Sequence, residues 1–307
     1  MSTRGNGVVA AALCILLGMP GRPASAQAAG PALDSLRNSI VERIAATPGA
    51  MSGVAFIDLQ TGEQLALNDD SVFHAASTMK IPVMIEVLRR SQAGAFTLDQ
   101  PVLLINSFKS LADGSRFSLE PADDGDSSLY QRVGQRVPVS ELMRLMITRS
   151  SNLATNQLIE LVGAAHITQG AHTLGATGIQ VLRGVQDLKA FDAGLVNTTT
   201  ARALATLLNE IESGRDLSPA SSAMMRDVLL AQEFNDKIPA GLPPGTRVAH
   251  KTGEITAVSH DAAIVYPTGR KPYVLVVLTR GVQDGKASAA LIADISRLVW
   301  SHVTRNQ

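Results

Sequence analysis

The sequence has almost no cysteine and few aromatic residues. Among its 307 residues there is one cysteine, and Phe, Trp and Tyr together make up 4%. The one thiol, Cys14, lies in an N-terminal segment that we expect to be removed, so disulfides and thiol catalysis are excluded for the rest of the chain. The residue before it, Leu13, is too large for a lipoprotein-processing site. The core must therefore consist of Leu, Val, Ile, Ala and Met.

An excess of charge of either sign is also missing. The chain has 27 basic and 27 acidic residues, and its basic residues occur in no run longer than a pair. This distribution argues against nucleic acid or an anionic membrane as a partner. The six histidines are isolated, with no spacing typical of a zinc site, so we expect neither a metal nor another cofactor. A G-x-S-x-G elbow is absent, which argues against an α/β-hydrolase esterase.

The N-terminal segment has the pattern of a secretory signal peptide. One arginine precedes an apolar run over residues 8–19, and a small-residue A-x-A site follows at residues 24–26. The run is too short to stay in a bilayer as a permanent anchor. We therefore predict a signal peptide over residues 1–26 and a secreted, periplasmic protein that begins near Gln27.

Strand and helix patterns divide the remaining chain into two parts. Segments with strand patterns lie at both ends: 53–59, 64–68, 247–255, 261–266 and 273–278. Segments with helical spacing fill the middle and close the chain: 33–44, 78–90, 140–148, 152–161, 199–211 and 287–303. This order predicts an α+β fold (an α/β sandwich), in which both termini build an antiparallel sheet flanked by helices and an all-helical subdomain is inserted.

We expect one catalytic domain over residues 27–307. Its sheet part comprises about 27–76 and 236–307, and its helical part about 77–235. A polar segment rich in Gly and Asp, residues 106–136, interrupts the helical part, and we interpret it as a solvated loop insertion at the junction of the two parts.

Three short motifs carry the candidate chemistry. They are Ser77-Thr-Met-Lys80, Ser150-Ser-Asn152 and Lys251-Thr-Gly253. Each is weak alone, because an S-x-x-K occurs by chance in many chains of this length. The ordered set is stronger, since the first motif opens a predicted helix, the second lies in a bend between two helices, and the third lies on a late strand.

The spacing of the first motif has a chemical reason. Residues three apart share one face of a helix, which brings the Lys80 amine towards the Ser77 hydroxyl. A serine becomes a good nucleophile when a neighbouring base takes its proton, and burial or a second cation such as Lys251 lowers the pKa of a lysine enough for that task. The helix N-terminus at Ser77 also favours developing negative charge.

The motif set resembles the S-x-x-K, S-D-N and K-T-G signature of class A serine β-lactamases and penicillin-binding proteins. The resemblance extends over the chain beyond the signal peptide. It implies that Ser77 is the nucleophile, Lys80 its base and Ser150 the group that passes a proton to the leaving nitrogen. Asn152 would hold the amide of the substrate's side chain.

The same resemblance assigns the third motif to substrate binding. Lys251, Thr252 and Gly253 would bind the substrate carboxylate and line the site with strand backbone. The backbone N–H groups of Ser77 and Glu254 would form the oxyanion hole.

Two departures from the class A pattern matter. Ser151 stands where these enzymes usually have aspartate, at a largely structural position. The loop glutamate that activates water for deacylation is also missing, because the corresponding stretch, residues 183–192, contains no glutamate and has Val185 or Gln186 in that place.

Three carboxylates lie near enough in the sequence to be considered as replacements: Asp187, Asp192 and Glu254. Asp187 is the candidate surrogate base, and the alternative is that it caps the chain locally or pairs with Arg183 or Lys189. For Glu254 the alternative is a solvent-facing side chain at the edge of a strand.

The sequence thus predicts a monomeric serine hydrolase with a small-molecule substrate, without nucleic acid, membrane anchor, metal or cofactor. A β-lactamase is the leading interpretation. A D-Ala-D-Ala carboxypeptidase would use the same acylation residues without the glutamate. A module that traps lactams with little turnover is the third possibility.

Overall fold

The computed structural model describes residues 1–3 and 30–305 of the chain. The predicted signal peptide lies outside these residues, apart from its first three. Within the described part, no helix is long and apolar enough to cross a membrane.

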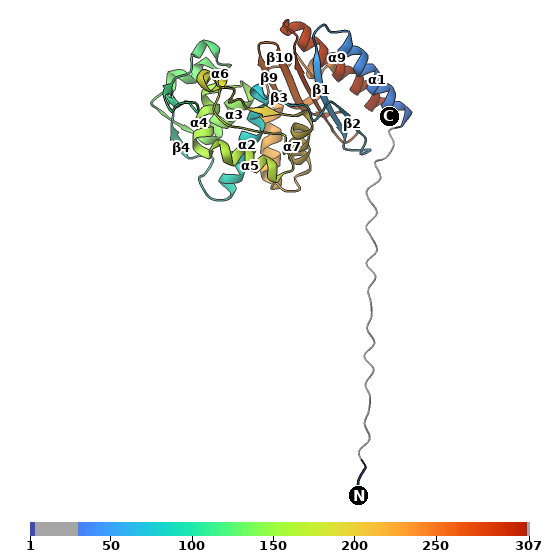
Figure 1. Ribbon diagram of the computed structural model, residues 1–307, viewed down its shortest axis with the longest axis horizontal. Coiled ribbons are helices and arrows are strands. Elements are labelled where there is room, and N and C mark those ends of the chain that lie inside the picture. The colour runs from blue at the N-terminus through green and yellow to red at the C-terminus, as the bar shows by residue number, and fades with distance from the viewer. Residues whose placement is uncertain (4–29, 306–307) are drawn as a thin grey trace.

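A five-stranded antiparallel sheet combines both ends of the chain, in the order β2-β1-β11-β10-β9 (Figure 1). Its strands are β1 (Met51–Asp58), β2 (Gln64–Leu67), β9 (Arg247–Ile255), β10 (Val258–Tyr266) and β11 (Tyr273–Arg280). Each neighbouring pair is antiparallel. Together with the helices described next, this sheet confirms the predicted α+β class.

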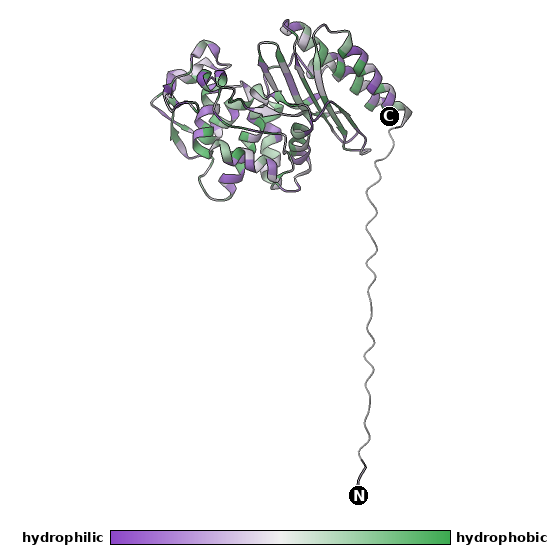
Figure 2. Ribbon diagram, in the orientation of Figure 1, coloured by the Kyte–Doolittle hydropathy of each residue, from purple (hydrophilic) through white to green (hydrophobic). Residues whose placement is uncertain are grey.

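Helices cover both faces of the sheet. Helices α1 (Pro31–Ala45) and α9 (Gly285–Thr304) pack side by side on one face, and α7 (Ala201–Ser213) packs against the other (Figure 1). Strand β11 serves both cores, because its side chains alternate between the faces. Leu275 and Val277 join the core under α1 and α9, whereas Val276 and Leu278 join the core of the helical part. In Figure 2, hydrophobic and hydrophilic bands alternate along α1 and α9, as this packing requires.

The helical part lies beside β9, at the edge of the sheet away from β2 (Figure 1). Its helices besides α7 are α2 (Lys80–Gln92), α3 (Val139–Thr148), α4 (Asn152–Val162), α5 (Ala164–Thr173), α6 (Leu188–Asp192) and α8 (Pro219–Leu230). Two short strands, β3 (Phe73–His74) and β8 (Thr198–Thr199), pair near its border with the sheet. The helix predicted from residue 78 starts earlier, as a 3-10 turn, η1 (Ala76–Met79), which leads into α2.

Residues 106–136 are largely exposed, as predicted from their polar composition, but they contain more regular structure than a loop. They form the strand pair β5 (Phe108–Lys109) and β6 (Arg116–Phe117) and the 3-10 turns η2 (Pro121–Asp123) and η3 (Ser127–Arg132). Strands β4 (Pro101–Leu103) and β7 (Arg136–Pro138) pair at the base of the segment. A few apolar residues anchor it, because the buried side chains Phe108, Leu119 and Leu129 belong to the core of the helical part.

A further 3-10 turn, η4 (Pro239–Gly241), precedes β9.

Candidate active site

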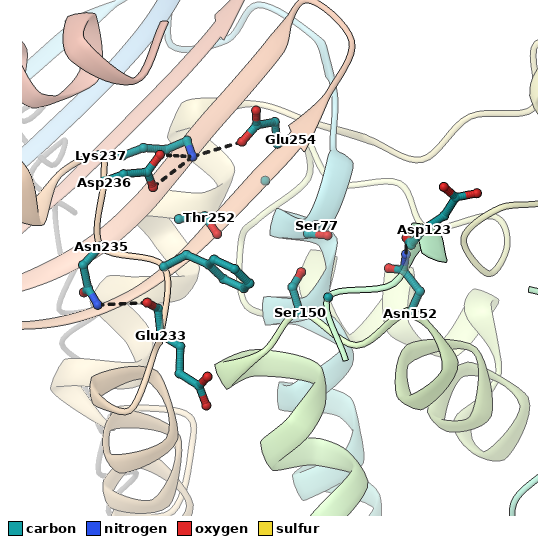
Figure 3. A pocket seen from close by; sticks show the side chains of 13 residues that line it. Ser77, Asp123, Ser150, Asn152, Glu233, Asn235, Asp236, Lys237, Thr252 and Glu254 are labelled. Carbon is teal, nitrogen blue, oxygen red and sulfur yellow. Dashed lines mark hydrogen bonds and ion pairs between the residues drawn. The ribbon is translucent and has the colours of Figure 1, made fainter. Parts of the chain in front are cut away.

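The three motifs meet at one cavity, although they are far apart in the sequence. The cavity has a volume of about 500 Å³ and lies between η1, the turn from α3 to α4, and the edge strand β9 (Figure 3). We call it the motif cavity. It is lined by Ser77, Asp123, Gly125, Ser150, Asn152, Glu233, Phe234, Asn235, Asp236, Lys237, Thr252, Gly253 and Glu254.

A second cavity of about 520 Å³ lies on the other side of Ser77. We call it the loop cavity, because residues 183–191 form much of its wall. It is lined by His74, Ala76, Ser77, Met79, Asp123, Asn152, Arg183, Val185, Gln186, Asp187, Leu188, Phe191, Asn197, Glu254, Ile255 and Thr256. Ser77 therefore faces both cavities.

The backbone around Ser77 is tightly constrained. Ala76 has a positive φ of 45°, which an L-residue rarely adopts and which costs about 1–3 kcal/mol. Its N–H donates to Nδ1 of His74 over 3.0 Å, which holds this strained residue in place. On the other side, a side chain on Gly253 would put its Cβ 3.1 Å from the backbone nitrogens of Ser77 and Thr78. Glycine is favoured at this position of the third motif because β9 lies directly against the backbone of Ser77.

Lys80 lies behind Ser77 and is fully buried. Its Nζ donates to the backbone oxygen of Ser150 over 2.7 Å and to Oδ1 of Asn152 over 2.9 Å, and it lies 3.1 Å from Oγ of Ser150. Burial lowers the pKa of the Lys80 amine to about 7, partly offset by the negative charge of Asp124. A substantial fraction of this amine is therefore neutral, and basic, at neutral pH.

Ser150 lies between two lysine amines. The fully buried Lys251 places its Nζ 3.1 Å from Oγ of Ser150 and donates to the backbone oxygen of Thr252 over 2.8 Å. Burial and then the charge of Lys80 lower the pKa of Lys251 well below its usual value. Ser150 itself has a positive φ of 56°, so the turn that presents its hydroxyl is strained as well.

Asn152 is held by a segment that sequence reasoning left out of the site. Its Nδ2 donates to the backbone oxygen of Asp123 over 3.1 Å, and its backbone N–H donates to the carboxylate of Asp124 at 2.9 and 3.0 Å. Gln186, on the loop opposite, also donates its Nε2 to the oxygen of Asp123 over 3.0 Å. The acidic run of residues 123–126 was visible in the sequence, but its polarity alone did not indicate contact with the motifs.

The carboxylate of Asp187 is held by local hydrogen bonds, and its use as a surrogate base stays a prediction. Its side chain is buried, Oδ1 accepts from Oγ of Ser110 over 2.8 Å and from the N–H of Ala190 over 3.1 Å, and Oδ2 accepts from the N–H of Leu111 over 2.8 Å. It thereby caps α6 and ties the loop to residues 110–111. The alternative of local capping is the one that the structure supports, whereas Lys189 pairs with Asp113 instead.

Val185 and Gln186, the two candidates for the place of the missing glutamate, lie on a loop whose backbone is held by Asn156. The N–H of Val185 donates to Oδ1 of Asn156 over 2.7 Å, and its carbonyl oxygen accepts from Nδ2 of the same residue over 3.0 Å. Val185 and Gln186 both line the loop cavity, and neither offers an acidic side chain to it.

Glu254 is exposed at the edge of β9, but it is not free. Nζ of Lys237 lies 3.2 Å from Oε2 of Glu254 and 3.4 Å from Asp236, and the Lys237 side chain is only 3% exposed (Figure 3). Sequence reasoning missed Lys237 because an isolated lysine carries no motif. The Lys237 amine is thus shared by the carboxylates of Glu254 and Asp236.

The family model described as "Beta-lactamase enzyme family" matches residues 35–303. The chain belongs to the β-lactamase family. It is 30% identical over 256 residues to a β-lactamase of Streptomyces albus G, which covers 82% of this chain and 79% of that protein. It is also 30% identical over 279 residues to the carbapenem-hydrolyzing β-lactamase KPC of Klebsiella oxytoca, covering 88% and 91% of the two chains.

Solved structures agree with this membership. An ancestral class A β-lactamase superposes with a TM-score of 0.76 at 31% identity, covering 87% of this chain and 99% of that one. The structure of PBP-A superposes with a TM-score of 0.76 at 28% identity, covering 93% and 98%. The protein is therefore a serine hydrolase of the β-lactamase type, related to both β-lactamases and penicillin-binding proteins.

Most of the site residues predicted for this β-lactamase-family member come together in the fold. Ser77, Ser150, Asn152, Thr252, Gly253 and Glu254 line the motif cavity, and Lys80 and Lys251 lie directly behind it. Asp187 borders only the loop cavity. Within the described residues, no group of three or more His, Cys, Asp or Glu side chains is placed to hold a metal ion.

Proposed function

We propose that this protein hydrolyses β-lactams through an acyl-enzyme on Ser77. One observation carries the proposal: two buried lysine amines approach Oγ of Ser150, each at 3.1 Å, beside a cavity that Ser77 lines. A base, a proton relay and a cation are thus assembled at a serine hydroxyl.

Neutral Lys80 is the base for acylation. Its two N–H groups serve the carbonyl oxygen of Ser150 and Oδ1 of Asn152, so its lone pair is the group that accepts a proton on the side where Oγ of Ser150 lies 3.1 Å away. As Oγ of Ser77 attacks the lactam carbonyl, Lys80 takes the hydroxyl proton, and the backbone N–H groups of Ser77 and Glu254 stabilise the oxyanion.

Ser150 completes the step as the proton relay. The C–N bond of the lactam breaks, and the proton passes from Lys80 through the Ser150 hydroxyl to the leaving nitrogen. Lys251, Thr252 and Gly253 bind the substrate carboxylate along the edge of β9, and Asn152 holds the amide of the substrate's side chain.

Deacylation is the weak half of the cycle. A water must attack the ester from the loop cavity, where Val185 or Gln186 stands in place of the usual glutamate and the Asp187 carboxylate accepts three hydrogen bonds. We therefore expect a long-lived acyl-enzyme and slow turnover of β-lactams.

The same observation favours a second candidate, a D-Ala-D-Ala carboxypeptidase. Such an enzyme shares the acylation residues and does not depend on the loop glutamate. A mutant of PBP-A, solved as an acyl-enzyme complex with penicillin-G, superposes on this chain with a TM-score of 0.75 at 30% identity, covering 88% of this chain and 97% of that one. Both candidates act on substrates outside the cytoplasm, which supports the proposal of a secreted, periplasmic protein. That it is a monomer without a membrane anchor is part of the same proposal.

The test is a time course of intact mass with a chromogenic cephalosporin while hydrolysis is followed. Repeated turnover of the cephalosporin, even slow and with an adduct present throughout, supports the β-lactamase. An adduct that forms once and is followed by no further hydrolysis supports the carboxypeptidase and calls for D-Ala-D-Ala peptides next. Ser77→Ala must lose the adduct in either case. Labelling that survives in Ser77→Ala would refute the acyl-enzyme on Ser77.

A further inference from the structure

The second motif lacks the aspartate that class A enzymes usually carry in its middle. Ser151 fills that position, fully buried, and its hydroxyl accepts only the N–H of Ala154, over 3.3 Å. This hydrogen bond caps one backbone donor at the start of α4 and leaves the N–H groups of Asn152 and Leu153 without a partner from within the motif.

A carboxylate from elsewhere in the chain accepts both of these donors. Asp124 accepts from the N–H of Asn152 at 2.9 and 3.0 Å and from the N–H of Leu153 at 2.9 Å. The hydroxyl of Tyr130 donates to the same carboxylate over 2.8 Å, which fixes its orientation. The N-terminus of α4 thus binds an anion supplied from 28 positions away.

The backbone around Asp124 is fitted to the motif turn. A Cβ on Gly125 would lie 2.1 Å from the backbone oxygen of Arg149, so only glycine allows this approach. The next residue, the buried Asp126, lies 3.6 Å from the Arg149 guanidinium. The preceding one, Asp123, accepts the side-chain amide of Asn152 through its backbone oxygen. The consecutive residues 123–126 therefore all contact the segment 149–153, which contains Ser150 and Asn152.

We propose that Asp124 is a positioning residue for acylation, which holds the Ser150–Asn152 turn from outside the motif in place of the missing aspartate. The proposal rests on the proposed function, because it concerns the same acylation step. It also assigns a role to residues 106–136, the segment that brings Asp124 to the site.

The turn is worth positioning because it contacts the base. Two of its oxygens, the carbonyl of Ser150 and Oδ1 of Asn152, accept the hydrogen bonds of Lys80. Two charged groups act on the Lys80 amine, the cation Lys251 across Ser150 and the anion Asp124, and the latter raises the pKa of Lys80. Asp124 therefore affects both the position of the Lys80 amine, through the turn, and its protonation, through its charge.

The experiment measures the second-order acylation rate constant with a fluorescent penicillin between pH 5 and 9. For Asp124→Asn we expect acylation about 10- to 100-fold slower, since small displacements of catalytic groups have effects of this size. The low-pH limb of the profile should move to lower pH, because the lost charge no longer favours protonated Lys80. A cap whose charge did not act on Lys80 would leave that limb in place.

Two further variants complete the design. Asp113→Asn removes an exposed carboxylate from the same segment and should leave rate and pH profile as in the wild type. The double variant Asp124→Asn with Ser151→Asp returns a carboxylate to the motif's own position and should recover at least about tenfold of the lost rate.

Each failure has a distinct signature. A wild-type protein that takes up no penicillin refutes the proposed function, whereas a labelled wild type with Asp124→Asn unchanged in rate and pH limb overturns the positioning role alone. If Asp124→Asn does not fold by circular dichroism, Tyr130→Phe decides, because it loosens the carboxylate but keeps its charge. A severalfold slower acylation with an unmoved pH limb then supports the proposal, and an unchanged rate overturns it.

Discussion

The two walls beside Ser77 differ in what their polar groups are free to do. On the wall formed by the three motifs, which we call the motif wall, Lys80 and Lys251 converge on one hydroxyl, that of Ser150. On the wall formed by residues 183–191, the carboxylate of Asp187 accepts three hydrogen bonds and Val185 offers no polar side-chain atom. The motif wall has amines and a hydroxyl placed for proton transfer, whereas the polar groups of the second wall, which we call the loop wall, hold its backbone in place.

The difference teaches that the two half-reactions of an acyl-enzyme cycle are separable in the structure. Acylation requires only the motif wall, while hydrolysis of the ester also requires a base on the loop wall. Under the proposed mechanism, this chain keeps the groups for the first half-reaction on the family's fold without an evident base for the second.

The largest expected effect comes from removing the base of the motif wall. Lys80→Ala should slow acylation by about a thousandfold or more, because the Ser77 hydroxyl then has no proton acceptor. In the wild type, acylation should rise with pH up to about 7 and level off above it, since the pKa of Lys80 is lowered to about 7 and only the neutral amine accepts a proton. Stopped-flow measurement of acylation across pH checks both statements, and a pH-independent rate between 5 and 9 would contradict the role of Lys80.

A glutamate on the loop wall should reduce the contrast between the two walls. Val185→Glu should accelerate deacylation by about tenfold or more, because general-base catalysis of water attack contributes at least that much when the geometry is suitable. Gln186→Glu is the matched variant at the neighbouring position, where the side chain is directed to Asp123. Decay of the labelled species, followed by mass, measures the effect. If neither glutamate shortens the life of the adduct, the loop wall is not the face from which water attacks.

A moderate effect on acylation is expected from the ion pair of Glu254 and Lys237, which both line the motif cavity. In Glu254→Gln, the Lys237 amine loses the closer of its two anionic partners. Acylation by a penicillin, which carries a carboxylate, should therefore rise about two- to tenfold at low salt, and less at high salt. Glu233→Gln removes a charge from the same cavity without freeing Lys237 and should change the rate less. Equal effects of the two variants would mean that the overall field of the cavity matters, and not this ion pair.

The smallest effect on activity is expected for Asp187→Asn. Deacylation should be unchanged, while the free energy of unfolding falls by about 1–3 kcal/mol because buried hydrogen bonds and the cap of α6 are weakened. Urea denaturation measures the stability, and the adduct lifetime measures the activity. A longer-lived adduct in a variant of normal stability would restore Asp187 as a base.

The sequence predicted the frame of this molecule well, for a physical reason. Strand and helix periodicities are local, and the motifs lie on elements that those periodicities define, the first two at helix starts and the third within a strand. The predicted strand at residues 247–255 has the same bounds as β9, and Asn152 was correctly placed at the start of a helix.

Other parts depend on contacts between distant residues and left no local pattern. Asp124 appeared only as one of several acids in a polar segment, and its contact with Asn152 depends on how residues 106–136 fold back on α4. Lys237 reaches Glu254 only because the chain between α8 and β9 returns to the cavity. The use of Asp187 as a cap likewise depends on Ser110, which lies 77 residues earlier.

The burial of Lys80 and Lys251 has a consequence for thermostability. Both side chains are fully buried, whereas in the unfolded chain their ammonium groups are hydrated, so at neutral pH folding must either desolvate these charges or release their protons. Either route lowers the free energy of unfolding below that of the same fold with apolar side chains at these positions. Replacing each lysine by methionine should therefore raise the melting temperature while acylation is lost, the exchange of stability for activity expected where an active site is built inside a protein core.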